Sequence, residues 1–344
     1  MPATFNPAMV YSFREMSQFY EPDGRMSTLI NTLLQDNPIL EHARWRNGNL
    51  EDGHKFKIVT KLPEPAWRRL YQGVNYTKSG VATVRETCRQ FADRWAIDVD
   101  EMRLWEGEKA QNAFRMQEAA LHIAGMKQFF AEHLFYADNK ANPDEFRGFH
   151  PRYPYRDAPN VIDAGATTGD TCSIWAVVWA ENADGQGAFC LAPKNSKTGI
   201  RHRDLGVFDA FDEDNKPYAA VGDEWKWDVG FGIGNWKYVA RICNIPVDKL
   251  NITDPSATDY VNLREMMIDC KNKIAPDVRK RVIWYVPNCV QNALEKQAIH
   301  PTAVHLRYGE FFKSEEVLKA FGRPVFECDA LLDTESPLPA APVS

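Results

Sequence analysis

The sequence predicts a mixed α+β chain with one body, one inserted domain and one projecting arm. Three observations predict it: a charged two-faced hairpin at residues 45–78, a long helical pattern at about 108–138, and a strand-rich stretch over 160–245. With 344 residues, of which 44% are hydrophobic and 26% charged, the chain is long enough to bury a large core and has an ordinary globular composition.

Residues 1–44 are expected to form an N-terminal arm. Within the arm, a short helical pattern of apolar residues begins at Met26 and ends at Asn37-Pro38, because the residue before a proline is biased away from the helical conformation.

The hairpin has two different faces. Phe56 and Ile58 share one face of a predicted strand over 55–62, whereas Lys55 and Lys57 occupy the other. Pro63-Glu-Pro65 is expected to make the turn, and a return strand over 67–74 follows. A two-stranded hairpin is marginal in water on its own, so its apolar face must be covered by the rest of this chain or by a neighbouring copy.

If a neighbouring copy covers the hairpin, the candidate residues of that subunit interface are those in which aromatic, aliphatic and cationic side chains alternate. They are Lys55, Phe56, Lys57, Ile58, Trp67, Arg68, Arg69 and Tyr71.

The pattern over about 108–138 predicts a helix about 45 Å long at 1.5 Å per residue, which is longer than an average helix. Asn142-Pro143 prevents its continuation. Its expected apolar stripe is Ala113, Met116, Ala120, Ile123, Phe130 and Leu134.

The second half of the chain predicts strands and two further helices. Strands are expected over 173–179, 187–191, 225–229, 236–242, 282–286 and 324–332, helices over 259–275 and 287–300, and a turn over 212–215. The Pro/Ala-rich tail over 336–344 is expected to fray.

Charge and cysteine usage exclude several classes of protein. A net charge of −6 argues against affinity gained by neutralising many phosphates. Seven cysteines without a CxxC pair indicate reduced thiols in a cytosol-like compartment. No apolar run approaches the roughly 18–20 residues that span a bilayer, and residues 1–16 lack the pattern of a secretory signal, so no membrane partner is expected.

No motif for catalysis, a cofactor or a metal is convincing, so we expect neither an enzyme nor a cofactor. Gly230-Phe-Gly-Ile-Gly234 lacks the strand-then-helix context of a phosphate loop and is better explained by a hairpin turn or bulge. His300 and His305 flank Pro301 without further ligands at suitable spacing. Asp209, Asp212 and Asp214 lack the glycine and glutamate of a calcium loop.

Ten tryptophans leave two interpretations open. Flat aromatic faces stack on sugars and bases, which favours a carbohydrate-binding protein or enzyme. Tryptophans within strand patterns instead fill cores and subunit contacts, which is the more common use.

The chain resembles a known family over about residues 15–335, through the joint order and spacing of short strings. These strings are Trp45-Arg-Asn-Gly-Asn49, Gly53-His-Lys55, Leu62-Pro-Glu-Pro-Ala-Trp-Arg68, Leu70-Tyr-Gln-Gly-Val74, Phe135-Tyr-Ala-Asp138, Asn142-Pro143, Pro151-Arg-Tyr153, Ile162-Asp-Ala-Gly165, Ser173-Ile-Trp175 and Trp236-Lys-Tyr238. In them the sequence is similar to the major capsid proteins of tailed bacteriophages with the Hong Kong 97 (HK97) fold, and among them to the epsilon15-like group.

The resemblance implies an HK97-like capsid fold with an extended loop over 45–78 and a peripheral domain over 79–154. It also implies an axial domain over 155–305, a return to the peripheral domain over 306–335 and a tail over 336–344. The implied function is a coat protein that assembles as pentamers and hexamers into an icosahedral shell around double-stranded DNA.

Scaffolding, portal and decoration proteins are the partners implied by the resemblance, with assembly in the host bacterial cytoplasm and a final location in the virion capsid. DNA would be enclosed without sequence-specific binding. An encapsulin-like cargo shell shares the fold and remains an alternative.

Overall fold

The computed structural model describes residues 35 and 37–342, apart from 105–106, 182–185, 197, 213, 253, 255–256, 258, 300–305 and 311–315. The helical pattern that begins at Met26, and the histidines His300 and His305, lie outside the described residues.

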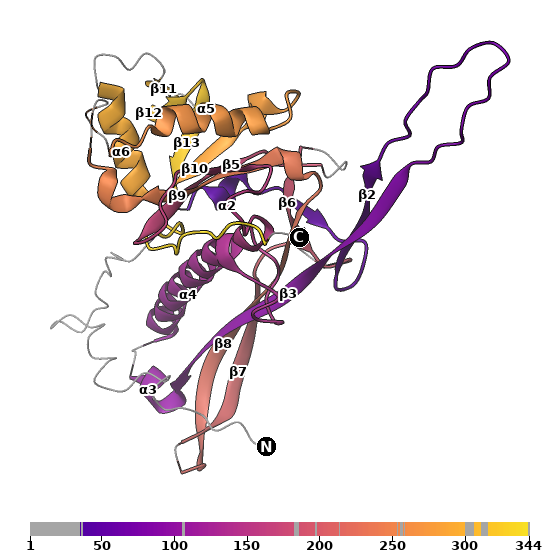
Figure 1. Ribbon diagram of the computed structural model, residues 1–344. Coiled ribbons are helices and arrows are strands. Elements are labelled where there is room, and N and C mark those ends of the chain that lie inside the picture. Colours follow the sequence, from indigo (N-terminus) through magenta and orange to yellow (C-terminus); the bar gives the residue numbers. More distant parts are fainter. Residues whose placement is uncertain are drawn as a thin grey trace. The chain divides into compact units, whose positions relative to one another are not determined.

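The α-helices are α2 (Ile39–His42), α3 (Val99–Arg103), α4 (Glu108–Tyr136), α5 (Leu263–Lys273) and α6 (Asn288–Ile299). The strands are β1 (Trp45–Asn47), β2 (Gly53–Lys61), β3 (Gly80–Asp98), β4 (Val161–Asp163), β5 (Thr171–Val177), β6 (Ala188–Ala192), β7 (Arg201–Phe211), β8 (Pro217–Ile233), β9 (Val239–Pro246), β10 (Ile283–Val286), β11 (Leu306–Glu310), β12 (Glu316–Ala320) and β13 (Arg323–Glu327). Figure 1 labels most of these elements along the chain.

The strands form two sheets. One has the order β11-β12-β13-β10-β5-β9-β4, and the other the order β1-β6-β8-β3-β2 with β7 paired to β8. The chain divides into two compact units. Of the described residues, unit 1 contains Gln35, Gln90–Phe130 and Gly199–Asp228, and unit 2 contains 37–89, Ala131–Thr198 and 229–342.

These units divide the chain at other places than the expected domains do. The β7–β8 hairpin falls within the range expected for one axial domain, 155–305, but residues 199–228 cluster with the long helix in unit 1. Strands β11, β12 and β13 lie within the range 306–335, which was expected to return to the peripheral domain. They belong to the sheet that contains β5 and β9, and β13 pairs in parallel with β10.

In unit 1, helix α4 buries one stripe against aromatic side chains of the sheet. The ring of Phe114 packs edge-on against Trp95 at 5.8 Å, and the ring of Phe130 lies 4.8 Å from that of Trp227. The bounds of α4 match the helix expected over about 108–138. Its expected apolar stripe is partly wrong, because the side chain of Met116 is 76% exposed. The helix turns Phe114, and not its neighbour Ala113, toward the sheet, because a phenyl ring buries more apolar area there than a methyl group does.

The turn expected over 212–215 is confirmed between β7 and β8. Asn215 adopts a left-handed conformation with φ of 63°, which asparagine tolerates better than most residues. The Asp212 carboxylate accepts a hydrogen bond from the Lys216 backbone N–H at 2.7 Å and so closes the turn.

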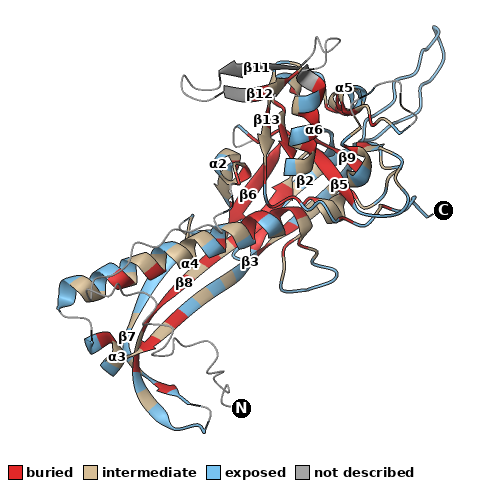
Figure 2. Cartoon of the chain, turned by 90° about the vertical axis from the view of Figure 1, so that its left-hand side faces the viewer, coloured by how far each residue is buried: buried red, intermediate tan, exposed pale blue. Residues whose placement is uncertain are grey.

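In unit 2, the central strands β5 and β9 are buried along almost their whole length, and Figure 2 shows both in the buried colour. Helices α5 and α6 cover one face of this sheet through a cluster that includes Met267, Cys270, Val290 and Leu294. The expected helices over 259–275 and 287–300 and the strand between them are confirmed as α5, α6 and β10.

A buried ion pair on the other side of the sheet ties the C-terminal segment to the core. The guanidinium of Arg241, on β9, is fully buried and donates to the Glu335 carboxylate at 2.8 Å and to the Ser173 hydroxyl at 2.9 Å. The Tyr136 hydroxyl donates to Glu335 at 2.6 Å. Burial, followed by the neighbouring Glu335 charge, raises the pKa of Tyr136 and keeps its hydroxyl a donor.

The segment after Glu335 is bound, so the expectation that the tail over 336–344 frays is wrong for its described part. Leu338 is buried and its backbone N–H donates to the Asn244 side chain at 2.7 Å. The Pro339 carbonyl accepts from the Arg156 N–H at 3.1 Å. Prolines and alanines predicted looseness, but partners distant in the sequence hold this segment in an extended path.

The glycine-rich string over 230–234 lies largely within strand β8 and is therefore neither a hairpin turn nor a phosphate loop. A Cβ on Gly230 would approach the Thr87 carbonyl oxygen to 2.8 Å, and a Cβ on Gly232 would approach the Phe189 ring to 2.8 Å. Glycines are needed here because another strand and an aromatic ring pass too close for any side chain.

Candidate subunit interface

The candidate interface occupies strand β2 and the segment 62–79, which we call the hairpin loop. Strand β2 pairs antiparallel with the start of β3, with Gly53 opposite Thr87 and Lys61 opposite Gly80. The return strand therefore begins at Gly80, and the expectation of a strand over 67–74 is wrong. Figure 1 shows the hairpin loop extending beyond the paired strands.

The turn at the end of the hairpin loop lies at residues 69–72, and not at the expected Pro63-Glu-Pro65. The Gln72 backbone N–H donates to the Arg69 carbonyl at 3.2 Å, and Tyr71 has a φ of 63°. Proline fixes φ near −65°, which an extended backbone accepts as readily as a turn does. The two prolines therefore continue the extended path.

The hairpin loop exposes its aromatic side chains completely. Trp67, Tyr71 and Tyr76 have relative exposures of 104%, 104% and 105%, and Leu70 is 84% exposed. Arg68 and Arg69 lie among them and are also exposed. Sequence reasoning selected Trp67 and Tyr71 as interface residues but missed Leu70 and Tyr76, although both are large apolar or aromatic residues within the same predicted arm.

Phe56 faces its own chain. Its ring lies 6.2 Å from that of Phe189 and stacks at 5.8 Å on His54, and it packs against the cluster of Cys88, Ala180, Phe189 and Leu191. Ile58, two residues further along the same face, is half-buried. This face of β2 is therefore covered at Phe56 by the chain itself, and the exposed apolar surface is concentrated in the hairpin loop.

Replacing Phe56 with alanine is expected to destabilise the free subunit by about 1–3 kcal/mol, less than a fully buried Phe→Ala change because the ring is only partly buried. Urea unfolding of the purified chain measures this effect. Lys57→Ala, on the opposite face of the same strand, is the control and should change stability by about 0.5 kcal/mol or less. Equal effects of the two changes would contradict the intrachain role of Phe56.

The opposite face of the hairpin is cationic. Lys55 and Lys57 are exposed on β2, and Arg85 of β3 stands directly opposite Lys55. Like charges placed directly across a strand pair disfavour each other. Arg85 forms an ion pair with Asp52, which offsets part of this repulsion.

An ion pair fixes the base of the hairpin. The Arg152 guanidinium makes two parallel hydrogen bonds, of 2.7 and 2.8 Å, to the carboxylate of Glu86 on β3. The same guanidinium donates to the Phe231 carbonyl at 3.1 Å and lies 5.3 Å from the centre of that ring. Bidentate Arg–carboxylate pairs have a defined geometry, so this contact holds Glu86 of β3 beside Arg152 and Phe231.

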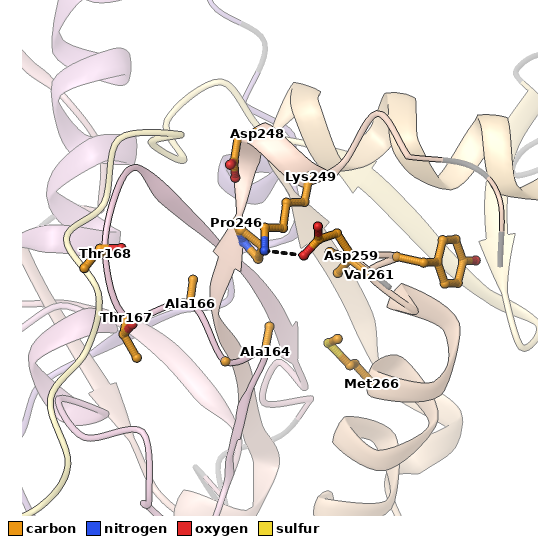
Figure 3. Close-up of a pocket in the computed structure, with 12 residues that line it drawn as sticks. Ala164, Ala166, Thr167, Thr168, Pro246, Asp248, Lys249, Asp259, Val261 and Met266 are labelled. Atoms are coloured by element: carbon orange, nitrogen blue, oxygen red, sulfur yellow. Dashed lines mark hydrogen bonds and ion pairs between the residues drawn. The ribbon is translucent and has the colours of Figure 1, made fainter. Parts of the chain in front are cut away.

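The alternative of a carbohydrate site finds no support among the described cavities. One of about 360 Å³ (Figure 3) is lined by the loop 164–168 and by residues near Lys249 and Met266. Among its described lining residues, Tyr260 is the one aromatic side chain, and an ion pair of 2.7 Å joins Lys249 to Asp259.

Most of the described tryptophans are core residues, which argues further against a stacking platform. Those that are buried are Trp95, Trp175, Trp179, Trp225, Trp227 and Trp284. Within the described part of the chain, no group of three or more His, Cys, Asp or Glu side chains is placed to hold a metal ion. No helix in that part is long and apolar enough to cross a membrane.

Comparison with solved structures defines the fold. A chain in the cryo-EM structure of bacteriophage Epsilon15 is similar with a TM-score of 0.76 and 24% identity, covering 99% of this chain and 100% of that chain. A chain of the bacteriophage JBD30 capsid has a TM-score of 0.50 and 10% identity, covering 93% and 99%. Comparison with curated proteins gives no match. The fold is the HK97-like capsid fold, and its mixed α+β class is confirmed.

From this fold the hairpin loop protrudes with its aromatic side chains exposed. The family model of the major capsid protein GP7 matches residues 21–339, and the chain belongs to that family. It is a phage coat protein and a component of the virion capsid rather than an enzyme. The resemblance drawn from the sequence is thereby confirmed. The family match identifies a phage capsid protein and not the encapsulin-like cargo shell that was the alternative.

Proposed function

We propose that this coat protein assembles as pentamers and hexamers into a closed icosahedral shell around the double-stranded DNA of a tailed phage. In this proposal the hairpin loop of each copy lies on a neighbouring copy. Phe56 supports the hairpin from within its own chain, and the residues of the hairpin loop make the contact with the neighbour. The proposed interface residues of the hairpin are Lys55, Phe56, Lys57, Ile58, Trp67, Arg68, Arg69 and Tyr71.

The observation that carries the proposal is the complete exposure of Trp67, Tyr71 and Tyr76 in one loop. An aromatic side chain buries about 150–250 Å², and apolar burial contributes about 25 cal/mol per Å². Leaving three such rings in water forgoes this stabilisation unless another molecule covers them. Many such contacts around a closed shell give an avidity that a single contact lacks.

Charge favours the same arrangement. The hairpin presents Lys55, Lys57 and Arg85 on one face, whereas the whole chain has a net charge of −6. A second copy with this net charge attracts a cationic arm overall, and complementary charge speeds association and sets orientation. A net acidic subunit also suits a container that encloses DNA without sequence-specific binding.

The proposal assigns the two compact units to the domains of the shell subunit. Unit 1, with the first part of α4 and the β7–β8 hairpin, is proposed as the core of the peripheral domain. The seven-stranded sheet of unit 2 is proposed as the axial domain, whose loops meet at five- and six-fold centres. Scaffolding, portal and decoration proteins are the proposed partners, and the bacterial cytoplasm is the proposed place of assembly.

Electron microscopy of the purified full chain tests the proposal. We expect closed shells, or rings of five and six subunits, when the chain is concentrated alone or together with the scaffolding protein of its own genome. Sedimentation should show the matching large species. A chain that stays monomeric at high concentration, in crowding agent, and with its scaffolding protein would overturn the proposal.

A further inference from the structure

Two cysteines of unit 2 lie in contact. Cys172 is the second residue of β5, Cys289 is the second residue of α6, and their Sγ atoms are 3.8 Å apart. Cys172 is fully buried and Cys289 is half-buried, and both pack in the core between the sheet and its covering helices. A disulfide bond needs an S–S distance of about 2.05 Å, so closure requires the two side chains to rotate toward each other from this contact.

The two thiols differ in reactivity. Cys289 sits in the first turn of a helix of 12 residues, where the positive end of the helix dipole favours a thiolate. The hydrogen bond shared with Cys172 lowers the pKa of Cys289, and the same bond together with burial raises the pKa of Cys172. The nearby Asp333 carboxylate opposes ionisation of both thiols. Cys289 is therefore the more accessible and the more nucleophilic member of the pair.

We propose that Cys172 and Cys289 form an intrachain disulfide when the folded chain meets a small-molecule disulfide such as oxidised glutathione. The Cys289 thiolate attacks one sulfur of the oxidant, forming a mixed disulfide and releasing one glutathione thiolate. The Cys172 thiolate then attacks the Cys289 sulfur, closing the protein disulfide and releasing the second glutathione thiolate. The two protein protons end on the two glutathione molecules, so two protein thiols are oxidised and one glutathione disulfide is reduced.

The compartment decides which form is present. Cytosolic glutathione keeps such a pair reduced, whereas a particle outside the cell meets an oxidising medium. The bond would join the central strand β5 to helix α6 across 117 residues of chain. Closing so long a loop restricts the unfolded chain strongly, so the crosslinked chain should unfold about 5–10 °C higher.

The test uses the full chain, incubated at mildly alkaline pH with oxidised glutathione. We expect the count of free thiols, measured after denaturation, to fall from seven to five. Peptide mapping without reductant should find one crosslinked peptide that contains Cys172 and Cys289, and thermal unfolding should shift upward until a reductant is added. Cys172→Ser and Cys289→Ser should each abolish the crosslinked peptide and the shift.

The control variant is Cys190→Ala, which removes another buried thiol and should leave the crosslink intact. Three results would overturn the inference: all seven thiols retained, a crosslink between other cysteines, or a glutathione adduct that persists on Cys289 without closure. The inference is independent of shell assembly, because the disulfide is measured within one chain. A chain that crosslinks but never assembles would count against the proposed function alone.

Discussion

Trp67→Ala should leave the free subunit folded while raising the concentration needed for shell assembly by about tenfold or more. Trp67 is 104% exposed in the chain, so its removal takes no apolar contact away from the folded subunit. In the proposed shell the same ring would be covered by a neighbour, and truncating a tryptophan at the centre of an interface costs about 2–4 kcal/mol. The cost is repeated at each such contact of the shell.

Two measurements separate folding from assembly for Trp67→Ala. Urea unfolding of the free subunit should match the unchanged protein within about 0.5 kcal/mol. Light scattering against protein concentration, with electron microscopy at each step, should show the delayed assembly. Trp67→Phe keeps a large apolar ring and should recover most of the assembly.

The matched control for this change is Trp236→Ala, which removes a tryptophan that is 50% exposed but lies outside the hairpin. It should delay assembly much less than Trp67→Ala. Loss of folding in Trp67→Ala would place this residue in the core of its own subunit and refute the role of the hairpin loop. Normal assembly of Trp67→Ala would refute it equally.

The sequence predicted the elements whose signal is local. The long helix α4, the turn over 212–215 and the helices α5 and α6 depend on periodicity, proline and polar turn residues within a few positions. The hairpin was predicted as an arm on a signal that is also local, namely the alternation of apolar and cationic residues such as Phe56 and Lys57 in neighbouring positions.

What the sequence did not show depends on partners far along the chain. The alternation of Trp67, Arg69 and Tyr71 suggested a strand, but an extended segment becomes a strand only if another strand pairs with it, and β2 pairs with residues 80–87. Phe56 was assigned to the arm's outer contact, whereas Phe189, distant in sequence, packs against it. A single sequence contains no signal for such pairings.

The buried charges were also beyond sequence reasoning. Arg241 lies in a strand pattern and Glu335 precedes a Pro/Ala-rich tail, so neither position suggested a paired ion in the core. The pair became visible only from the fold, which brings β9 beside the C-terminal segment.

Arg241→Met is expected to destabilise unit 2 by about 3–5 kcal/mol, because it leaves the Glu335 charge buried without its partner. The change removes the hydrogen bonds to Glu335 and Ser173 and the guanidinium that lies 4.9 Å from the Trp175 ring centre. Urea unfolding of the free subunit should show a lower midpoint. Low yield of soluble protein is the expected secondary effect.

A double variant isolates the uncompensated charge from the loss of packing. Arg241→Met combined with Glu335→Leu removes both charges and should be more stable than Arg241→Met alone, because an apolar pair of similar volume often replaces a buried ion pair at little cost. The control is Lys249→Met, whose ion pair with Asp259 is exposed by 42% and 57% and should contribute about 1 kcal/mol or less. If Arg241→Met costs no more than Lys249→Met, the buried pair does not hold the C-terminal segment to the sheet, and unit 2 owes its stability to its apolar core.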